Sequence, residues 1–222
     1  MKNNLFITLT TGILMLLSSL SYAKRPELSY NYLSIGGNNG DRQLEVSSSN
    51  GLLSNTDVKF RGFFLNGSKS IADNFYLTGS ASSHESDKFY PFEGSLEVRK
   101  FNVDYYRLQL GLGFNVDIMR NQHGIFQINY EQEAYSISDK LIEDQNLIST
   151  NTESGFSIKA GLRSLFADFI ETGLYLEHID TSQTNTGAIV EARVNIMQKA
   201  SIGLTGTFND NALYSLDFRA NF

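Results

Sequence analysis

The chain has 222 residues with 24 acidic and 18 basic side chains, two prolines, and neither cysteine nor tryptophan. This length suits one domain of about 200 residues or two small ones. The lack of cysteine excludes disulfide scaffolds, thiolate metal sites, cysteine nucleophiles and lipid attachment through cysteine. The net charge of −6 argues against a nucleic-acid-binding protein, which normally carries a basic face.

Residues 1–23 have the composition of a secretory signal peptide. Lys2 supplies the positive charge near the start, an apolar stretch follows, and a Ser-Tyr-Ala triplet ends the segment with the small residues that signal peptidase requires. The alternatives are a membrane anchor or a buried helix, but the apolar stretch is shorter than the roughly 20 residues of a spanning helix. We therefore predict cleavage after Ala23, export from the cytoplasm, and a single domain over residues 24–222.

The rest of the chain alternates apolar and polar residues with a period of two, which is the pattern of β-strands. In the clearest segment, apolar side chains occupy every second position from Tyr106 to Val116, with polar residues or glycine between them. No stretch reaches the length of a membrane-spanning helix, and no segment keeps helical spacing over three turns. Ten segments follow the strand pattern: 28–36, 58–65, 75–82, 106–116, 126–138, 156–163, 170–177, 188–196, 201–208 and 214–222.

Two observations favour a membrane barrel over a soluble β-sandwich, whose strands alternate in the same way. Long and short connections follow each other along the chain, as in outer-membrane barrels with long extracellular loops and short periplasmic turns. The polar positions of the strands also carry nearly equal numbers of opposite charges, which suggests a shared interior. We therefore predict an all-β, transmembrane, antiparallel up-and-down barrel in the outer membrane, with about ten strands and eight or twelve as alternatives.

The charges assigned to the interior are seven basic and six acidic side chains. A ten-stranded barrel is only slightly wider than the eight-stranded kind whose side chains fill the lumen. Because unpaired charges would be costly to desolvate there, we predict a packed salt-bridge network rather than a water-filled passage. Its members are Lys59, Arg61, Arg107, Glu131, Glu133, Lys159, Arg163, Glu171, Glu177, Glu191, Arg193, Asp217 and Arg219.

The last strand ends in phenylalanine at the end of the chain. Tyr214, Leu216, Phe218 and Phe222 all occupy the apolar parity of this strand. Such an ending looks like the signal read by the machinery that inserts outer-membrane barrels. The expected partners are thus outer-membrane lipid, lipopolysaccharide and the barrel assembly machinery, with no nucleic acid, and the barrel is expected to be a monomer.

Three segments resemble a known group of outer-membrane proteins: residues 28–33 (LSYNYL), 106–115 (YRLQLGLGFN) and 161–164 (GLRS). These are small β-barrel proteins associated with quorum sensing and diffusible-signal regulation. The resemblance implies a small monomeric barrel in the outer membrane, linked to biofilm formation or virulence. It brings no catalytic residues with it.

Two histidine-containing segments are candidates for catalysis. His84 and Ser86 match the His-x-Ser spacing of lipid A deacylases, with Glu85 between them, and His178 with Asp180 could supply the His–Asp pair of an omptin-like protease. We interpret all of them as exposed polar residues without a catalytic role. The three histidines are far apart in sequence and cysteine is lacking, so we predict neither a metal site nor a cofactor.

Five tyrosines are expected in the aromatic belts at the two membrane interfaces. These are Tyr30, Tyr32, Tyr106, Tyr130 and Tyr214.

The pattern as a whole predicts a non-enzymatic barrel that acts through its extracellular loops in surface integrity, adhesion, or envelope and biofilm signalling. A narrow porin-like channel for small solutes is the second hypothesis. The third is an outer-membrane enzyme that modifies lipid A or peptides. The internal charges discriminate between the first two hypotheses, and the geometry of histidine, serine and acidic residues at the barrel mouth tests the third.

Overall fold

The structure is a computed structural model that describes residues 28–44, 56–91, 98–139, 147–166, 169–181, 184–209 and 212–222. The predicted signal peptide and its cleavage site at Ala23 lie outside the described residues. Among the described residues, no helix has the length and apolar character needed to cross a membrane.

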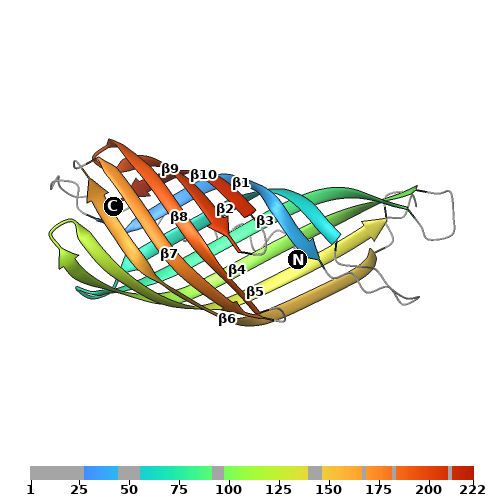
Figure 1. The fold of residues 1–222 in the computed structure, drawn as a ribbon, viewed down its shortest axis with the longest axis horizontal. Helices are drawn as coiled ribbons and strands as arrows, with labels where there is room; N and C mark the ends of the chain where they lie inside the picture. The colour runs from blue at the N-terminus through green and yellow to red at the C-terminus, as the bar shows by residue number, and fades with distance from the viewer. Residues whose placement is uncertain are drawn as a thin grey trace.

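Ten antiparallel strands form one closed barrel (Figure 1). Each strand pairs with its neighbours in sequence, and β1 pairs with β10 to close the barrel. The predicted all-β up-and-down barrel of ten strands is confirmed. The strands are β1 (Tyr32–Leu44), β2 (Thr56–Ser70), β3 (Phe75–Pro91), β4 (Val98–Met119), β5 (Gln122–Asp139), β6 (Leu147–Phe166), β7 (Ile170–Asp180), β8 (Thr184–Met197), β9 (Ala200–Phe208) and β10 (Ala212–Asn221).

Several strands are longer than their alternating segments. The segment 75–82 is only the first half of β3, which has 17 residues, and β4 has 22. Backbone pairing continues where the alternation fades, for example between Phe89 and Lys100. Hydropathy alternation marks only the part of a strand with one apolar face, so it missed these extensions.

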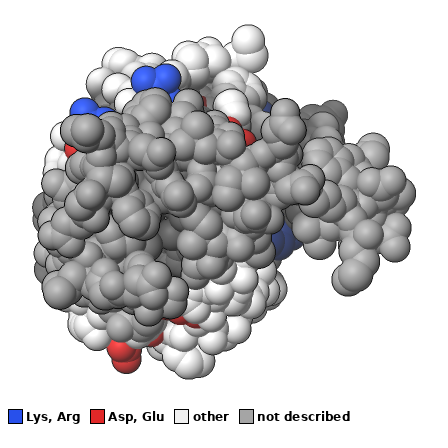
Figure 2. All heavy atoms as spheres, turned by 90° about the vertical axis from the view of Figure 1, so that its right-hand side faces the viewer, with Lys and Arg blue, Asp and Glu red and all other residues white. Residues whose placement is uncertain are grey.

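The two ends of the barrel differ in their connections. Residues 71–74, 120–121, 167–169 and 198–199 join strands at one end, which we call the short-turn end and which also holds Leu28 and Phe222. The strand ends that flank 45–55, 92–97 and 140–146 lie at the other, the long-loop end. Figure 2 looks onto the long-loop end, where described acidic and basic groups both show at the margin.

Apolar side chains face outward around the barrel, and polar ones fill it. Leu110, Leu176 and Leu204 are each more than half exposed. The largest fully buried side chains, by contrast, include Glu131 and Asn129. This inside-out distribution suits a barrel whose outer wall contacts hydrocarbon.

The inward and outward faces of strand β2 are the reverse of those predicted. Phe60 is 3% exposed and faces the lumen, whereas Phe63 is 77% exposed and faces outward. Lys59 and Arg61 therefore lie on the outer face, and their assignment to the interior was wrong. The physical reason is that Phe60 packs against interior aromatic rings, with its ring centroid 6.0 Å from that of Tyr105.

Candidate functional site

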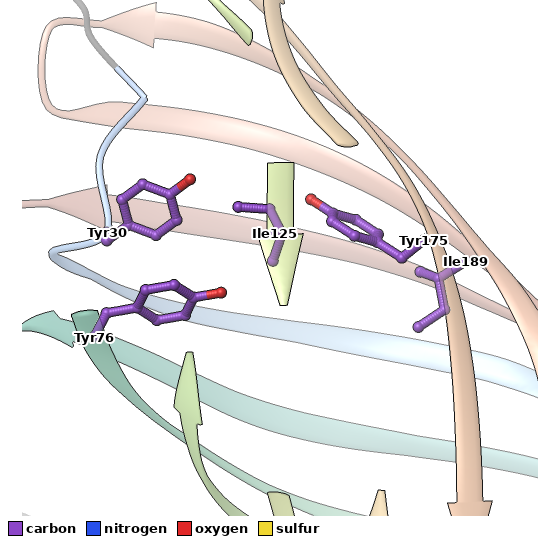
Figure 3. Close-up of a cluster of buried hydrophobic side chains, with 5 residues drawn as sticks. All are labelled: Tyr30, Tyr76, Ile125, Tyr175 and Ile189. Carbon is purple, nitrogen blue, oxygen red and sulfur yellow. The ribbon is translucent and has the colours of Figure 1, made fainter. Parts of the chain in front are cut away.

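The lumen contains a cluster of buried side chains toward the short-turn end. Tyr30, Tyr76, Ile125, Tyr175 and Ile189 are buried and contact one another there. Figure 3 shows Tyr30 and Tyr76 on one side of Ile125 and Tyr175 on the other, with the rings directed toward it. We call this group the tyrosine layer.

The segment before β1 supplies the first ring of the tyrosine layer. Leu28 and Tyr30 are each 8% exposed, so this segment enters the lumen instead of continuing the outer wall. The Tyr30 ring stacks on Tyr76 with the centroids 4.7 Å apart. Its hydroxyl lies 2.9 Å from Nδ1 of His123, so the layer is held by both packing and hydrogen bonding.

Glycines on the neighbouring strands make room for the large rings. A Cβ atom at Gly113 would overlap the ring of Tyr76, and one at Gly173 would lie 2.5 Å from the Tyr175 hydroxyl. Only a residue without a side chain fits beside an inward-pointing tyrosine at these two positions.

An ion-paired cluster borders the tyrosine layer. Arg163 Nη2 lies 2.8 Å and Arg219 Nη1 lies 2.9 Å from the same Glu171 oxygen. Arg163 also donates a hydrogen bond to the backbone oxygen of Ser29 at 2.9 Å, and its guanidinium lies 5.0 Å from the centre of the Tyr30 ring. This cluster therefore attaches the N-terminal segment to the barrel wall.

A second cluster surrounds Arg107 on β4 and β5. Arg107 Nη2 lies 2.6 Å from Glu131, and its Nε lies 3.5 Å from Glu133. The Tyr105 and Tyr135 hydroxyls donate to Glu133 at 2.7 and 3.1 Å. One arginine and two tyrosines thus stabilise two buried carboxylates.

A third pair is formed by Arg193 on β8 and Asp217 on β10. Arg193 Nη2 lies 2.9 Å from both Asp217 oxygens, and Nη1 donates to the Ser201 hydroxyl at 3.3 Å. Both side chains are about 5% exposed. Buried, hydrogen-bonded charges therefore line the lumen at this place as well.

The structure brings together eight members of the predicted charge network as ion pairs and leaves five outside those pairs. The paired residues are Arg107, Glu131, Glu133, Arg163, Glu171, Arg193, Asp217 and Arg219. Lys159, Glu177 and Glu191 face the lumen without an ion pair among the described residues. Lys59 and Arg61 lie on the outer face, as described for β2.

A cavity of about 300 Å³ occupies the lumen beyond the tyrosine layer, toward the long-loop end. Ile189 of the tyrosine layer contributes to its lining. One part of its wall is aromatic and consists of Phe60, His84 and Tyr105. Glu177, on β7, also lines the cavity. The cavity thus combines aromatic rings with charged groups.

The first candidate catalytic group is divided between the two faces of β3. His84 and Ser86 are each 5% exposed, so their interpretation as exposed residues was wrong. The His84 ring packs 5.2 Å from Tyr105. Strand alternation places Glu85 on the opposite, outer face, away from both.

The other candidate pair faces outward. His178 lies on the apolar parity of β7 and is exposed, with Nδ1 2.7 Å from the Thr186 hydroxyl. Asp180 accepts a hydrogen bond from Thr184 at 3.3 Å. Among the described residues, no group of three or more histidines and acids is placed to hold a metal ion.

The five tyrosines predicted for the aromatic belts divide into two groups. Tyr106, Tyr130 and Tyr214 are 42–58% exposed on the outer wall. Tyr30 and Tyr32 are inside, Tyr32 with the Arg219 guanidinium 4.1 Å from its ring centre, so their assignment to the belts was wrong. The reason is that polar partners in the lumen attract these two rings.

The C-terminal strand presents its predicted assembly residues on the outer wall. Tyr214, Leu216 and Phe218 are 58%, 56% and 45% exposed. The Phe222 backbone N–H donates to the Asn31 oxygen at 3.1 Å, and the Lys69 ammonium lies 5.2 Å from its ring centre.

No protein-family model matches the sequence, and no curated protein matches it. Solved barrels share its fold at low sequence identity. The translocator domain of the autotransporter NalP from Neisseria meningitidis is 12% identical, covers 97% of this chain and 95% of its own, and has a TM-score of 0.54. The outer-membrane protease OmpT from Escherichia coli is 8% identical over 91% of this chain and 99% of its own, with a TM-score of 0.48.

The attachment invasion locus protein Ail of Yersinia pestis is also similar. It is 12% identical over 87% of this chain and 98% of its own, with a TM-score of 0.37. The likeness to the NalP domain, together with the closed sheet and the apolar outer wall, identifies the fold. The chain has the fold of Gram-negative outer-membrane β-barrel proteins.

Proposed function

We propose that this protein is a non-conducting, non-enzymatic barrel of the outer membrane that acts through its long-loop end in surface integrity, adhesion, or envelope and biofilm signalling. The observation that supports the proposal best is the tyrosine layer, a cluster of five buried side chains in the lumen toward the short-turn end. A pore needs a continuous polar passage, and buried rings bordered by tight ion pairs leave little room for one.

The orientation follows from the connections. Bacterial outer-membrane barrels have short periplasmic turns and longer extracellular loops. The long-loop end is therefore assigned to the cell surface, and the tyrosine layer to the periplasmic side. Lipopolysaccharide is the expected neighbour of the outer wall, the assembly machinery the expected partner of β10, and the barrel is expected to be monomeric.

The positions of the histidines support a role without catalysis. His84 is packed between aromatic rings and His178 faces the outer wall. A general base must reach the proton that it removes within about 3 Å, together with a nucleophile and an acid in one accessible site. His84 shares the inner face of β3 with Ser86 but not with Glu85, and His178 and Asp180 lie together on the outward parity of β7. Neither candidate group therefore presents a base, a nucleophile and an acid at one accessible site among the described residues.

Conductance across planar lipid bilayers tests the proposal. We expect the wild-type barrel to show negligible steady current. Replacing both Tyr30 and Tyr76 with alanine removes two stacked rings of the tyrosine layer and should admit small ions. The matched control replaces the outward-facing Tyr106 and Tyr130 with alanine and should stay closed.

A large, stable, ion-selective current through the wild-type protein would contradict the proposal and favour the narrow channel. A wild-type-dependent change in the acyl pattern of lipid A, abolished by His84→Ala or Ser86→Ala, would favour the enzyme hypothesis instead.

A further inference from the structure

The charges that remain inside the barrel do not balance. Because Lys59 and Arg61 are on the outer face, the predicted interior set keeps five basic residues against six acidic ones. The excess is also local. Arg193 is matched by Asp217, while Glu171 serves both Arg163 and Arg219, so these two clusters carry no excess of negative charge.

Besides the exposed Asp41, three charged groups border the cavity outside the ion pairs: Lys159, Glu177 and Glu191. They surround one side chain of the tyrosine layer. The Lys159 ammonium lies 5.3 Å from the centre of the Tyr175 ring, and the Tyr175 hydroxyl lies 3.4 Å from a Glu191 oxygen. Glu177 follows Tyr175 by two residues on β7, so both side chains point to the same face of the strand.

Glu177 is the member that has no hydrogen bond or ion pair among the described residues, although it lies within the electrostatic reach of Arg107. It is 8% exposed and lines the cavity. Lys159 is its register neighbour across β6 and β7, yet the ammonium lies over the Tyr175 ring instead of pairing with the carboxylate. No hydrogen bond or ion pair joins Glu177 to any described residue. A buried carboxylate normally has such a partner, because desolvating a lone charge is costly.

The cations that face Glu177 across the cavity are already engaged. Arg107 is bound to Glu131 at 2.6 Å and lies near Glu133, and its charge also acts on Glu177. Arg107 and Lys159 together offset four carboxylates, those of Glu131, Glu133, Glu177 and Glu191. Among the described residues, this part of the lumen therefore has a surplus of negative charge, which a cation of suitable size would neutralise.

The cavity is suited to a small molecule with one apolar part. Its volume of about 300 Å³ lies at the lower end of the range of ligand pockets. Aromatic side chains of β2 and β4, Phe60 and Tyr105, line the same cavity and offer ring faces to a cation or an alkyl chain.

We propose that this cavity binds a small organic cation with an ammonium group, and that Glu177 and Glu191 are the carboxylates that recognise it. The described lining of the site extends from the tyrosine layer toward the long-loop end. This inference goes beyond the proposed surface role and does not depend on whether the barrel conducts.

Calorimetric titration of the full barrel in lipid nanodiscs tests the site. The probe is 1,4-diaminobutane, compared with butyrate and with n-butanol at the same ionic strength. We expect the diamine to bind with a measurable heat and the anion and the alcohol not to bind. Glu177→Gln should weaken the binding at least tenfold, and Lys159→Gln should strengthen it because a competing cation is lost.

The matched control is Glu85→Gln, which removes one carboxylate from the outer face of β3. The affinity of this variant for 1,4-diaminobutane should equal that of the wild type. The folded fraction of every variant is checked by its mobility on unheated gels. If Glu177→Gln fails to fold, Glu191→Gln and Lys159→Gln provide the same comparison. Failure of the wild type to bind the diamine at millimolar concentration, equal binding of butyrate, or an equal loss in Glu85→Gln would each overturn the proposal.

Discussion

At the scale of single residues, Glu171 pairs with two arginines, because its carboxylate lies within ion-pair distance of both the Arg163 and the Arg219 guanidinium groups. Glu171→Gln would leave Arg163 and Arg219 without their counter-charge in a buried environment. We expect this change to lower the free energy of unfolding by about 3 kcal/mol, the scale seen when one partner of a buried ion pair is removed. Urea unfolding of the barrel in detergent, followed by tyrosine fluorescence, measures it.

The control for this experiment is Asp73→Asn, which removes an exposed carboxylate from the turn 71–74. Its unfolding midpoint should match the wild type, because exposed charges contribute little to stability. Equal midpoints for Glu171→Gln and the wild type would show that the cluster does not stabilise the barrel.

The sequence was informative about which residues face the lumen but not about which ones meet there. Alternation alone placed Arg107 and Arg193 inside, since each sits between outward-facing apolar neighbours, and it placed Glu131 inside because Tyr130 before it faces outward. Arg163 and Ser29, by contrast, are 134 positions apart and contact each other across the barrel. Such partners depend on strand tilt and side-chain length, which no local pattern encodes. The buried position of His84 was missed because its surroundings in sequence are polar on both parities.

At the scale of elements, strand β2 shows how alternation can mislead. Phe60 and Phe64 lie on one parity and Phe63 and Leu65 on the other, so the segment has apolar residues on both faces. The prediction of which parity faces the lumen then depended on the basic residues Lys59 and Arg61, and it was wrong. They sit on the outer wall nearer to the long-loop end than Phe63, where a charge can reach the membrane interface.

The segment Leu28–Asn31 makes the stability of the barrel depend on pH. Tyr30 precedes the first strand, and burial raises its pKa to about 12 in spite of the neighbouring Arg163. An unfolded tyrosine ionises near pH 10. The stabilisation from neutral Tyr30 is therefore complete below about pH 10 and is lost as the pH rises from there through about 12.

We expect Tyr30→Phe to lose less stability than the wild type between pH 8 and pH 11, because it has no hydroxyl to ionise. Urea unfolding at both pH values measures the difference, and the outward-facing Tyr106→Phe serves as control. If Tyr30→Phe and the wild type lose the same free energy of unfolding, the segment Leu28–Asn31 does not stay in the lumen in solution.

At the scale of the whole molecule, closure of the sheet between β1 and β10 protects every backbone edge. We expect the protein to fractionate with outer membranes and to migrate on unheated gels at a different apparent mass than after boiling. A closed barrel keeps its hydrogen bonds in detergent, and heat removes them. Recovery in the soluble periplasmic fraction would rule out the barrel as the native state.

Assembly of the molecule is expected to depend on its final residue. Phe222→Asp should reduce the membrane-inserted yield several-fold, because the assembly machinery would meet a charge at the end of the lipid-facing series on β10. Phe89→Asp, at the far end of β3, is the control and should assemble normally. Quantification of heat-modifiable protein in isolated membranes compares the two, and similar yields would contradict a role for Phe222 in insertion.

The unequal strands of the barrel give its wall unequal heights. A tilted strand of about ten residues spans the bilayer, yet β4 has 22 residues and β6 has 20, whereas β9 has nine. The surplus residues of β3 to β6 project beyond the rest at the long-loop end (Figure 1). The described rim is consequently slanted, with its low edge formed by β7 to β10. As far as the described strands go, a solute diffusing parallel to the membrane would meet a lower wall on that side than on the opposite one.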